Sequence, residues 1–399
     1  MKSSRILSLV FATFFSLAAL AQGPQNELQV LKEKVGPVSD KKNEYGQSIE
    51  WDKARPQFVT FAFTNGKGDT ETFYFNLTDL NESMVKIETR RDLAYVEILT
   101  NGGKDLIKVT ENGEVQNFEH DFEIMANGIE DARTISEAFK KAIAAARKEE
   151  ENREEVKKSK QELLQLLSDK VQNVVINDDT WEQSFSFNPD NHNLVTVQTN
   201  DQSREKSEEF TVNLADLNPF KTDFKTKGRE VLVTTETKGG RKLAGYRENG
   251  EQGNYTDDFE FKAASVENAR TISRALKALA TMAGEESVED YTSWSEEKCM
   301  KFLQENVQQV VIGDDAWKQT LSPASQKGLF VYTVEDVAKG TRAEFAANAA
   351  DLRPETVEFD TKGNEVLVFL ETAKGARVVA TIEDNEQGNY TNQVQIRAT

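Results

Sequence analysis

Two pairs of adjacent acidic residues are the first candidates for chemistry in this sequence. They are Asp178-Asp179 and Asp314-Asp315, and each pair stands just before a tryptophan. Adjacent carboxylates could hold Ca²⁺ or act as a general acid and base. The corresponding stretch at residues 47–50 reads QSIE and has no such pair. We therefore predict turns in which each Asp side chain bonds its own backbone. The same interpretation applies to three other recurrent acids: Asp79, Asp216 and Asp351.

The histidines and the cysteine offer no stronger candidate. His120 and His192 have no metal-ligand neighbour at helical or hairpin spacing, so we predict that both lie on the surface. Cys299 has no histidine in its part of the chain to act as a base, and we predict a small buried hydrophobic residue. The fingerprints of P-loops, dinucleotide folds, zinc proteases and serine hydrolases are absent. The sequence therefore predicts no catalytic residue, no cofactor site and no metal site, with calcium at the Asp pairs left open.

The elements around these residues come in three copies. The motif Asn-x-x-Asp-Leu begins at Asn76, Asn213 and Asn348, at offsets of 137 and 135 residues. Other matches join residues 171–181 to 307–317, 226–233 to 361–368, and 132–136 to 269–273. Each copy is larger than a solenoid repeat, so we predict three tandem domains, called modules 1, 2 and 3 below.

The middle copy shows the order of elements most clearly. Apolar residues at helical spacing predict a leading helix at 162–175. From 181 to 262 the pattern alternates, as in residues 209–214, and turn residues divide it into about seven short strands. The helical period returns at 265–282, with Ser265 as the candidate N-cap of a closing helix. The apolar face of this helix carries Ile272, Leu276 and Leu279.

About seven strands followed by one amphipathic helix resemble the pleckstrin-homology-like barrel in element order. In that fold two nearly orthogonal sheets form a barrel, and the helix plugs one open end. The resemblance covers each copy and implies an α+β chain of three tandem small antiparallel β-barrel modules with flanking helices. A lipocalin-like barrel and a β-sandwich with an appended helix remain alternatives.

These patterns give the domain organisation. We predict a signal peptide at 1–21, module 1 at 22–147, a charged helical linker at 148–160, module 2 at 161–283, a linker at 284–295 and module 3 at 296–399. Residues 132–169 contain no Gly or Pro, and a continuous helix there would be about 55 Å long. Gly284 should interrupt any helix that runs into the second linker, residues 284–295.

A late turn recurs almost unchanged, as GEQGNYT at 250–256 and NEQGNYT at 385–391. We predict that Gly253 and Gly388 supply the positive φ of a tight turn. Tyr255 and Tyr390 should then pack back on the barrel. A binding loop is the functional alternative.

The third copy lacks the closing helix after its last strand at 394–397. An uncovered end exposes apolar surface and invites a foreign or neighbouring helix. We favour instead that the leading helix of this copy, residues 296–311, covers the place.

The core of the third copy also differs in side-chain size. Ala347 and Ala349 replace a valine and a leucine, while Phe330 and Tyr332 replace two valines. We predict that volume is exchanged across one core, which packing tolerates. A cavity for an apolar ligand is the alternative.

Residues 1–21 resemble an export signal. Lys2 and Arg5 precede an apolar run at 6–17, and Ala19-Leu20-Ala21 is a cleavage site of small residues. The run is too short to span a membrane comfortably, so a membrane anchor is the weaker alternative. We predict a cleaved bacterial signal peptide, a secreted or periplasmic protein, and no transmembrane segment in the mature chain.

The charge and the single cysteine limit the function. Loss of Lys2 and Arg5 takes the net charge from −19 to −21, which repels nucleic-acid phosphates and anionic lipids. One cysteine leaves the domains without an internal disulfide. We expect a non-catalytic binding or assembly protein with a protein or cell-envelope partner and no nucleic acid. A carboxylate-dependent extracellular hydrolase and a carrier of a small apolar ligand are the alternatives.

Overall fold

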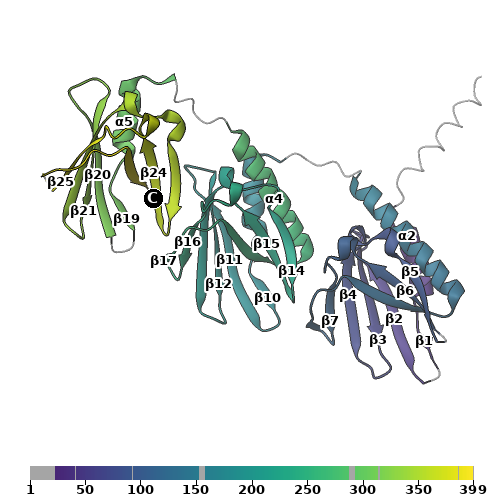
Figure 1. The fold of residues 1–399 in the computed structure, drawn as a ribbon. Coiled ribbons are helices and arrows are strands. Elements are labelled where there is room, and N and C mark those ends of the chain that lie inside the picture. The colour runs from purple at the N-terminus through teal and green to yellow at the C-terminus, as the bar shows by residue number, and fades with distance from the viewer. Residues whose placement is uncertain are drawn as a thin grey trace, which may run out of the picture. The chain divides into compact units, whose positions relative to one another are not determined.

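The computed structural model describes residues 23–398 apart from 41, 92, 152–157, 287–292, 313–314 and 385. The predicted signal peptide and Asp314 lie outside the described residues. The chain forms two compact units, of which one centres on module 1 and the other contains modules 2 and 3. Three times, the described chain repeats antiparallel sheets with accompanying helices (Figure 1).

The elements follow the same order in each module. Module 1 has α1 (Gln25–Lys34), β1 (Val38–Ser39), β2 (Glu44–Trp51), β3 (Phe58–Thr64), β4 (Thr70–Asn76), η1 (Leu77–Asp79), η2 (Glu82–Met84), β5 (Lys86–Arg90), β6 (Leu93–Leu99), η3 (Asn101–Gly103), β7 (Lys108–Glu111), β8 (Glu114–Val115), β9 (Asp121–Ala126) and α2 (Ile129–Glu151). Module 2 has α3 (Lys160–Lys170), β10 (Val174–Ile176), β11 (Asp179–Phe187), β12 (Leu194–Asp201), β13 (Lys206–Asn213), η4 (Leu214–Asp216), β14 (Asp223–Lys227), β15 (Glu230–Glu236), η5 (Lys238–Gly240), β16 (Gly245–Glu248), β17 (Glu251–Gln252), β18 (Asp258–Ala263) and α4 (Val266–Glu285). Module 3 has α5 (Glu296–Asn306), β19 (Val310–Ile312), β20 (Asp315–Pro323), β21 (Leu329–Asp336), β22 (Thr341–Asn348), η7 (Ala349–Asp351), η8 (Pro354–Thr356), β23 (Glu358–Lys362), β24 (Glu365–Glu371), η9 (Ala373–Gly375), β25 (Ala380–Glu383), β26 (Glu386–Gln387) and β27 (Gln393–Ala398).

Each module contains two separate open sheets. In module 1 the larger sheet has the order β1-β2-β3-β4-β7-β8, and the smaller has the order β5-β6-β9. Modules 2 and 3 repeat both orders. The antiparallel α+β class is therefore confirmed, whereas the closed barrels are not, because the sheets stay open. The stretch 181–262 also contains eight strands, β11 to β18, one more than the sequence predicted.

A buried glutamine joins the two sheets of each module, and sequence reasoning missed it. In module 2 the side chain of Gln183 on β11 accepts a hydrogen bond from Lys262 N at 2.8 Å. Its Nε2 donates to the carbonyl oxygens of Lys262 and Gln172, both at 3.0 Å. Lys262 lies on β18, so these bonds connect the large sheet to the small one. Gln47 and Gln319 make the same set of bonds in modules 1 and 3.

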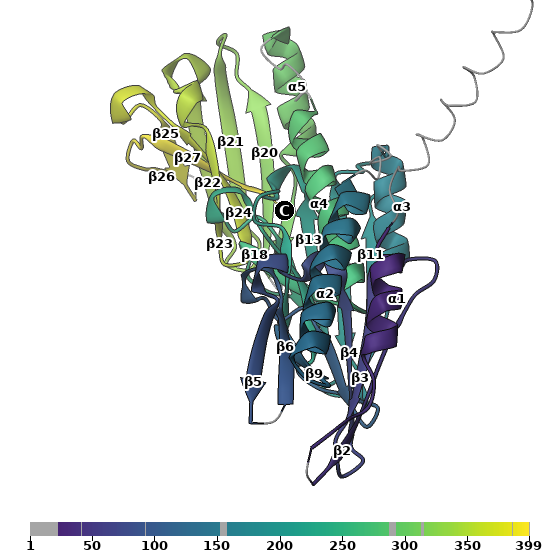
Figure 2. The same ribbon diagram turned by 90° about the vertical axis from the view of Figure 1, so that its right-hand side faces the viewer.

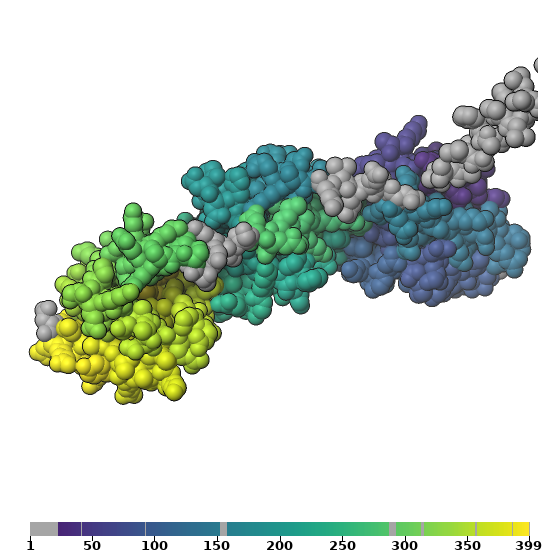
Figure 3. Space-filling model, turned by 90° about the horizontal axis from the view of Figure 1, so that it is seen from above, coloured from purple at the N-terminus to yellow at the C-terminus, as the bar shows by residue number. Residues whose placement is uncertain are grey.

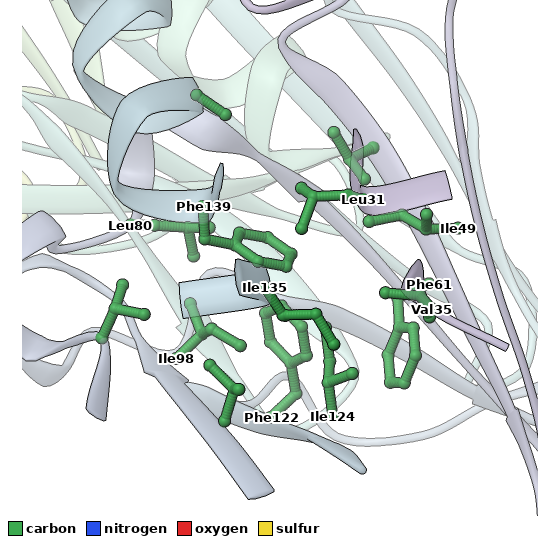
Figure 4. Packing of buried hydrophobic residues seen from close by; sticks show 14 of the residues in the cluster. Leu31, Val35, Ile49, Phe61, Leu80, Ile98, Phe122, Ile124, Ile135 and Phe139 are labelled. Carbon is green, nitrogen blue, oxygen red and sulfur yellow. The ribbon is translucent and has the colours of Figure 1, made fainter. Parts of the chain in front are cut away.

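The core of module 1 lies between both sheets and its two helices. Figure 4 shows Ile135 and Phe139 of α2 pointing toward Phe122 and Ile124 of β9. The rings of Phe122 and Phe139 meet edge to face, with centroids 6.2 Å apart. Leu31 of α1 belongs to the same cluster, so the leading helix and the closing helix share one core. Figure 2 shows α1 and α2 side by side over the sheets.

The predicted closing helix of module 2 is confirmed, whereas the leading helices are shorter than predicted, because Val174–Ile176 and Val310–Ile312 form strands β10 and β19. Ser265 caps α4, accepting a hydrogen bond from Asn268 N, and Ile272, Leu276 and Leu279 are buried as predicted. The continuous helix at 132–169 is wrong, because Ser159 has extended backbone angles and begins α3 with a capping box to Glu162. This box satisfies the first N–H groups of a new helix. Helix α4 ends at Glu285, one residue after Gly284.

The recurrent late turn needs glycine for a different reason than predicted. Gly253 and Gly388 do not have positive φ, and in module 2 the positive values belong to Asn249 (51°) and Gly250 (82°). A Cβ on Gly253 would lie only 2.6 Å from Cδ1 of Tyr246, and one on Gly388 would collide with Oγ1 of Thr381. Glycine is therefore required by the close approach of neighbouring strands. Tyr255 is half-buried, but Tyr390 is 52% exposed, so the packing prediction holds for the first tyrosine alone.

Within the described part of the chain, no helix is long and apolar enough to cross a membrane.

Candidate functional site

The acids singled out by the sequence do not come together. Asp178 and Asp179 are exposed at the turn between β10 and β11, and Asp315 is exposed at the start of β20. Among the described residues no group of three His, Cys, Asp or Glu side chains is placed to hold a metal. Asp216 ends the short turn η4, where burial raises its carboxyl pKa against the opposing pull of Lys238 and Arg241.

The Asn-x-x-Asp-Leu motif proves to be an asparagine-capped 3₁₀ turn. The Asn76 Oδ1 accepts a hydrogen bond from Thr78 N at 3.0 Å, and Asn213 and Asn348 repeat the bond at 2.9 Å. The recurrent asparagine therefore has a local structural role. Arg133 and Arg270 each pair with the glutamate three residues earlier on their own helix.

Both histidines lie on the surface, as predicted. His120 Nδ1 lies 3.2 Å from Asp105 Oδ1, and the His192 ring packs edge to face on Phe187. Neither histidine belongs to a cluster with metal-ligand geometry among the described residues.

The most distinctive surface of the described chain is an apolar groove in module 3. Its volume is about 680 Å³, within the range of binding sites for small molecules. The lining comes from α5, both sheets and the η7 turn: Glu296, Cys299, Met300, Leu303, Leu321, Lys327, Gly328, Phe330, Asn348, Ala349, Ala350, Leu352, Val357, Val368, Leu370 and Ile396. Apolar side chains dominate, and we call this surface the module 3 groove.

The same surface is covered by the closing helix in modules 1 and 2. Helix α2 contacts α1, η1 and the small sheet, and α4 contacts α3 and η4 in the same way. The covered positions are fully buried there, for example Leu31 and Leu80 in module 1 and Leu167 and Leu217 in module 2. In module 3 the described residues contain no helix after β27, and these positions become accessible.

The exposed fractions of side chains at matched positions show how much apolar surface is uncovered in module 3. Leu303 is 40% exposed where Leu31 and Leu167 are buried, and Val357 is 48% exposed where Val85 and Thr222 are buried. Ala349 is exposed where Leu77 and Leu214 are buried, so the floor of the groove is also hollowed. Figure 3 shows the green α5 part of module 3 at the molecular surface. An apolar surface of this kind is typical of an interaction site.

The leading helix of module 3 does not cover the place, contrary to our preference. Helix α5 packs on β20 and forms one wall of the groove, and none of its residues is buried. The reason is geometric: a leading helix occupies its own strip of the module, next to the strip that the closing helix would fill.

Cys299 is half-buried and faces this groove, so the prediction of a buried hydrophobic residue is wrong. Its counterpart Leu163 is buried because module 2 keeps its closing helix. The repeat places Cys299 and Leu163 at the same helical position, so the difference in exposure comes from what packs over that position.

The predicted exchange of core volume is found on one side of the groove. Tyr332 is fully buried, stacks on Phe345 with ring centroids 5.9 Å apart, and donates a 2.5 Å hydrogen bond to Gln319 Oε1. Burial raises the pKa of the Tyr332 phenol. Ala347 is buried against this cluster, whereas the space at Ala349 stays unfilled.

The ends of the groove differ in charge from the filled site of module 2. There Lys160 Nζ, at the start of α3, lies 2.5 Å from Glu286 Oε1 at the C-cap of α4. Asn193 Nδ2 also donates to Glu286, at 2.7 Å. The Lys160 bond and then the Asn193 bond hold the pKa of the Glu286 carboxyl below its ordinary value. In module 3 the corresponding residues are Glu296 and Gly328, whose N–H donates to Glu296 Oε1 at 3.2 Å.

The module 3 groove is thus the candidate site: apolar and open, with the carboxylate of Glu296 at one end. The chain matches no known family model, no curated protein and no solved structure.

Proposed function

We propose that the protein is an exported, non-catalytic binding or assembly protein that engages its partner through the module 3 groove. The observation that carries the proposal is that modules 1 and 2 bury this surface under a closing helix, whereas no helix among the described residues covers it in module 3. Exposed apolar surface costs free energy in water, and a bound partner removes that cost. The acidic charge of the chain supports a partner other than nucleic acid.

The test is site-specific cross-linking of the full chain in the cells that produce it. A thiol-reactive photocrosslinker on Cys299 faces the groove. The matched control places the label on Lys301→Cys in a Cys299→Ala background, because Lys301 lies on the same helix and is exposed outside the groove. We expect a discrete protein adduct from position 299 and none from position 301. Equal adducts from both positions, or none from either, would contradict the proposal.

The volume and apolar lining of the groove favour a second candidate, a carrier of a small apolar ligand. Native mass spectrometry of the chain purified from its own cells separates the two. A carrier shows the mass of a bound small molecule, and the binding protein shows a protein partner or the free chain.

We also propose that the modules are related to the pleckstrin-homology-like fold. Two sheets and one closing helix support it in modules 1 and 2, with the barrel open along the seam that the buried glutamine crosses.

A further inference from the structure

The expected direction of a helix in the module 3 groove follows from the two modules that contain a closing helix. In module 1 the Nζ of Lys34, in the last turn of α1, lies 2.9 Å from the Oδ1 of Asp131, in the first turn of α2. In module 2 Lys160, at the start of α3, pairs with Glu286 at the end of α4. Leading and closing helices therefore run antiparallel. A helix in the module 3 groove in the same direction has its C-terminal end beside Glu296.

The shape of the groove matches one face of an α-helix. Helices α2 and α4 fill the equivalent surface with apolar residues at spacings of three and four, such as Ile272, Leu276 and Leu279. The groove retains the apolar wall of the leading helix and the apolar face of the small sheet. The exposed Ala349 leaves additional room, so the occupant carries a large apolar side chain at that point.

The charge at the rim of the groove indicates that its occupant differs from the closing helices α2 and α4. Position 160 is lysine and contacts the helix end in module 2, whereas position 296 is glutamate. Lys327 also lines the groove, and its counterpart in module 2 is His192, which packs on Phe187. The end of α4 carries Glu285 and Glu286, and the end of α2 carries residues 149–151, all glutamate. Placed beside Glu296, either helix would bring like charges together.

We propose that the module 3 groove binds an amphipathic α-helix other than α2 and α4, antiparallel to α5, with a lysine or arginine at its C-terminal end. The inference rests on the proposed function and names the class of partner. The basic residue pairs with Glu296 and also interacts favourably with the dipole of its own helix. The acidic ends of α2 and α4 make a second copy of this chain the poorer occupant.

The probe is a fluorescent 22-residue peptide with the sequence of residues 265–286. A second peptide carries Glu285→Lys and Glu286→Lys, and a third adds Ile272→Asp and Leu276→Asp to the lysines. Fluorescence anisotropy measures the binding of each peptide to the full chain, and the rate of Cys299 alkylation reports whether the groove is covered. We expect the lysine peptide to bind about fivefold more tightly than the glutamate peptide, with the difference shrinking at high salt. The aspartate peptide should not bind.

Variants of the chain test both parts of the proposal. Leu303→Glu should abolish binding, whereas the control Gln304→Glu, exposed on the same helix, should leave it unchanged. Both positions are exposed, so neither change threatens folding. Glu296→Lys should reverse the preference between the lysine and glutamate peptides.

The results distinguish this inference from the proposed function. Peptide binding that protects Cys299 and depends on Leu303 supports a helix as the occupant. Equal binding of the aspartate peptide, or no protection of Cys299, overturns it. If cross-linking at Cys299 succeeds while the lysine peptide fails, the groove binds a partner that is not a helix of this kind. An unchanged peptide preference in Glu296→Lys overturns the charge assignment.

Discussion

In each module one amide side chain joins the two sheets. Gln183 supplies one acceptor and two donors to backbone groups of β18 and of the segment after α3. The glutamine is buried in all three modules. Buried backbone groups need partners, and the open seam offers no strand to pair with them. The glutamine thus does at this seam what strand pairing does inside a sheet.

Replacing Gln183 with methionine should destabilise module 2 by about 3 kcal/mol. Methionine keeps the approximate volume but leaves the Lys262 N–H and two carbonyl oxygens without these bonds, and each unsatisfied buried group costs roughly 1–3 kcal/mol. Urea denaturation of the full chain, with hydrogen exchange at β18, measures the loss. The control Gln198→Met changes an exposed glutamine on β12 and should stay within about 0.5 kcal/mol of wild type. A similar loss in both variants would contradict the bridging role.

Gly253→Ala should cost about 1–3 kcal/mol through a clash with Tyr246. Tyr246 cannot yield freely, because its hydroxyl donates to Glu248 Oε2 at 2.6 Å. Gly250→Ala is the matched change at positive φ, where a Cβ meets no atom within 4 Å and the cost is backbone strain. Tyr246→Ala should therefore relieve Gly253→Ala and leave Gly250→Ala unrelieved in thermal unfolding. Additive double mutants in both cases would show that the clash is not the cause.

At the scale of elements, the closing helix α4 ends at an acidic residue that pairs with the start of α3. Folding holds the pKa of Glu286 below its ordinary value, so its contribution to stability is present above the unfolded pKa. That contribution is lost as the pH falls through the folded pKa. We expect the amides in the last turn of α4 to lose protection, relative to the exchange rate of an unstructured chain at the same pH, below about pH 4. Hydrogen exchange measured as the pH is lowered should show this loss of protection in the wild-type chain and not in Glu286→Gln. The same response in both would assign it to another group.

Local pattern was enough to predict the order of helices and strands within modules, because apolar spacing is set by the face that each element buries. It did not predict strands β10 and β19, whose residues the pattern assigned to the leading helices. It could not predict that the sheets stay open, since pairing across the seam depends on strands far apart in the chain. The break at Ser159 was readable, because Ser159 and Glu162 form a capping box in the sequence as well as in space. Gly253 shows the limit: its type suggested a positive φ, whereas the cause is the ring of Tyr246.

At the scale of the whole molecule, the candidate site arises from a difference between copies. The repeat showed which elements of module 3 have counterparts in modules 1 and 2, but it could not show the groove, because its depth depends on how α5 packs and on Ala349. Modules 1 and 2 show what closure requires. In module 2, Ala264 and Ser265 connect the last strand to α4, and β27 ends at the position that matches Ala263.

Joining residues 264–286 directly after Ala398, with Glu285→Lys and Glu286→Lys, should therefore close module 3 in cis. Burying even a few of the apolar side chains of the helix should raise the unfolding temperature of the module by roughly 10 °C. Alkylation of Cys299 should slow, and the lysine peptide and the cross-linked partner should no longer bind. The same extension with Ile272→Asp and Leu276→Asp is the control and should change none of these. Partner binding that survives a protected Cys299 would place the interaction site elsewhere on the molecule.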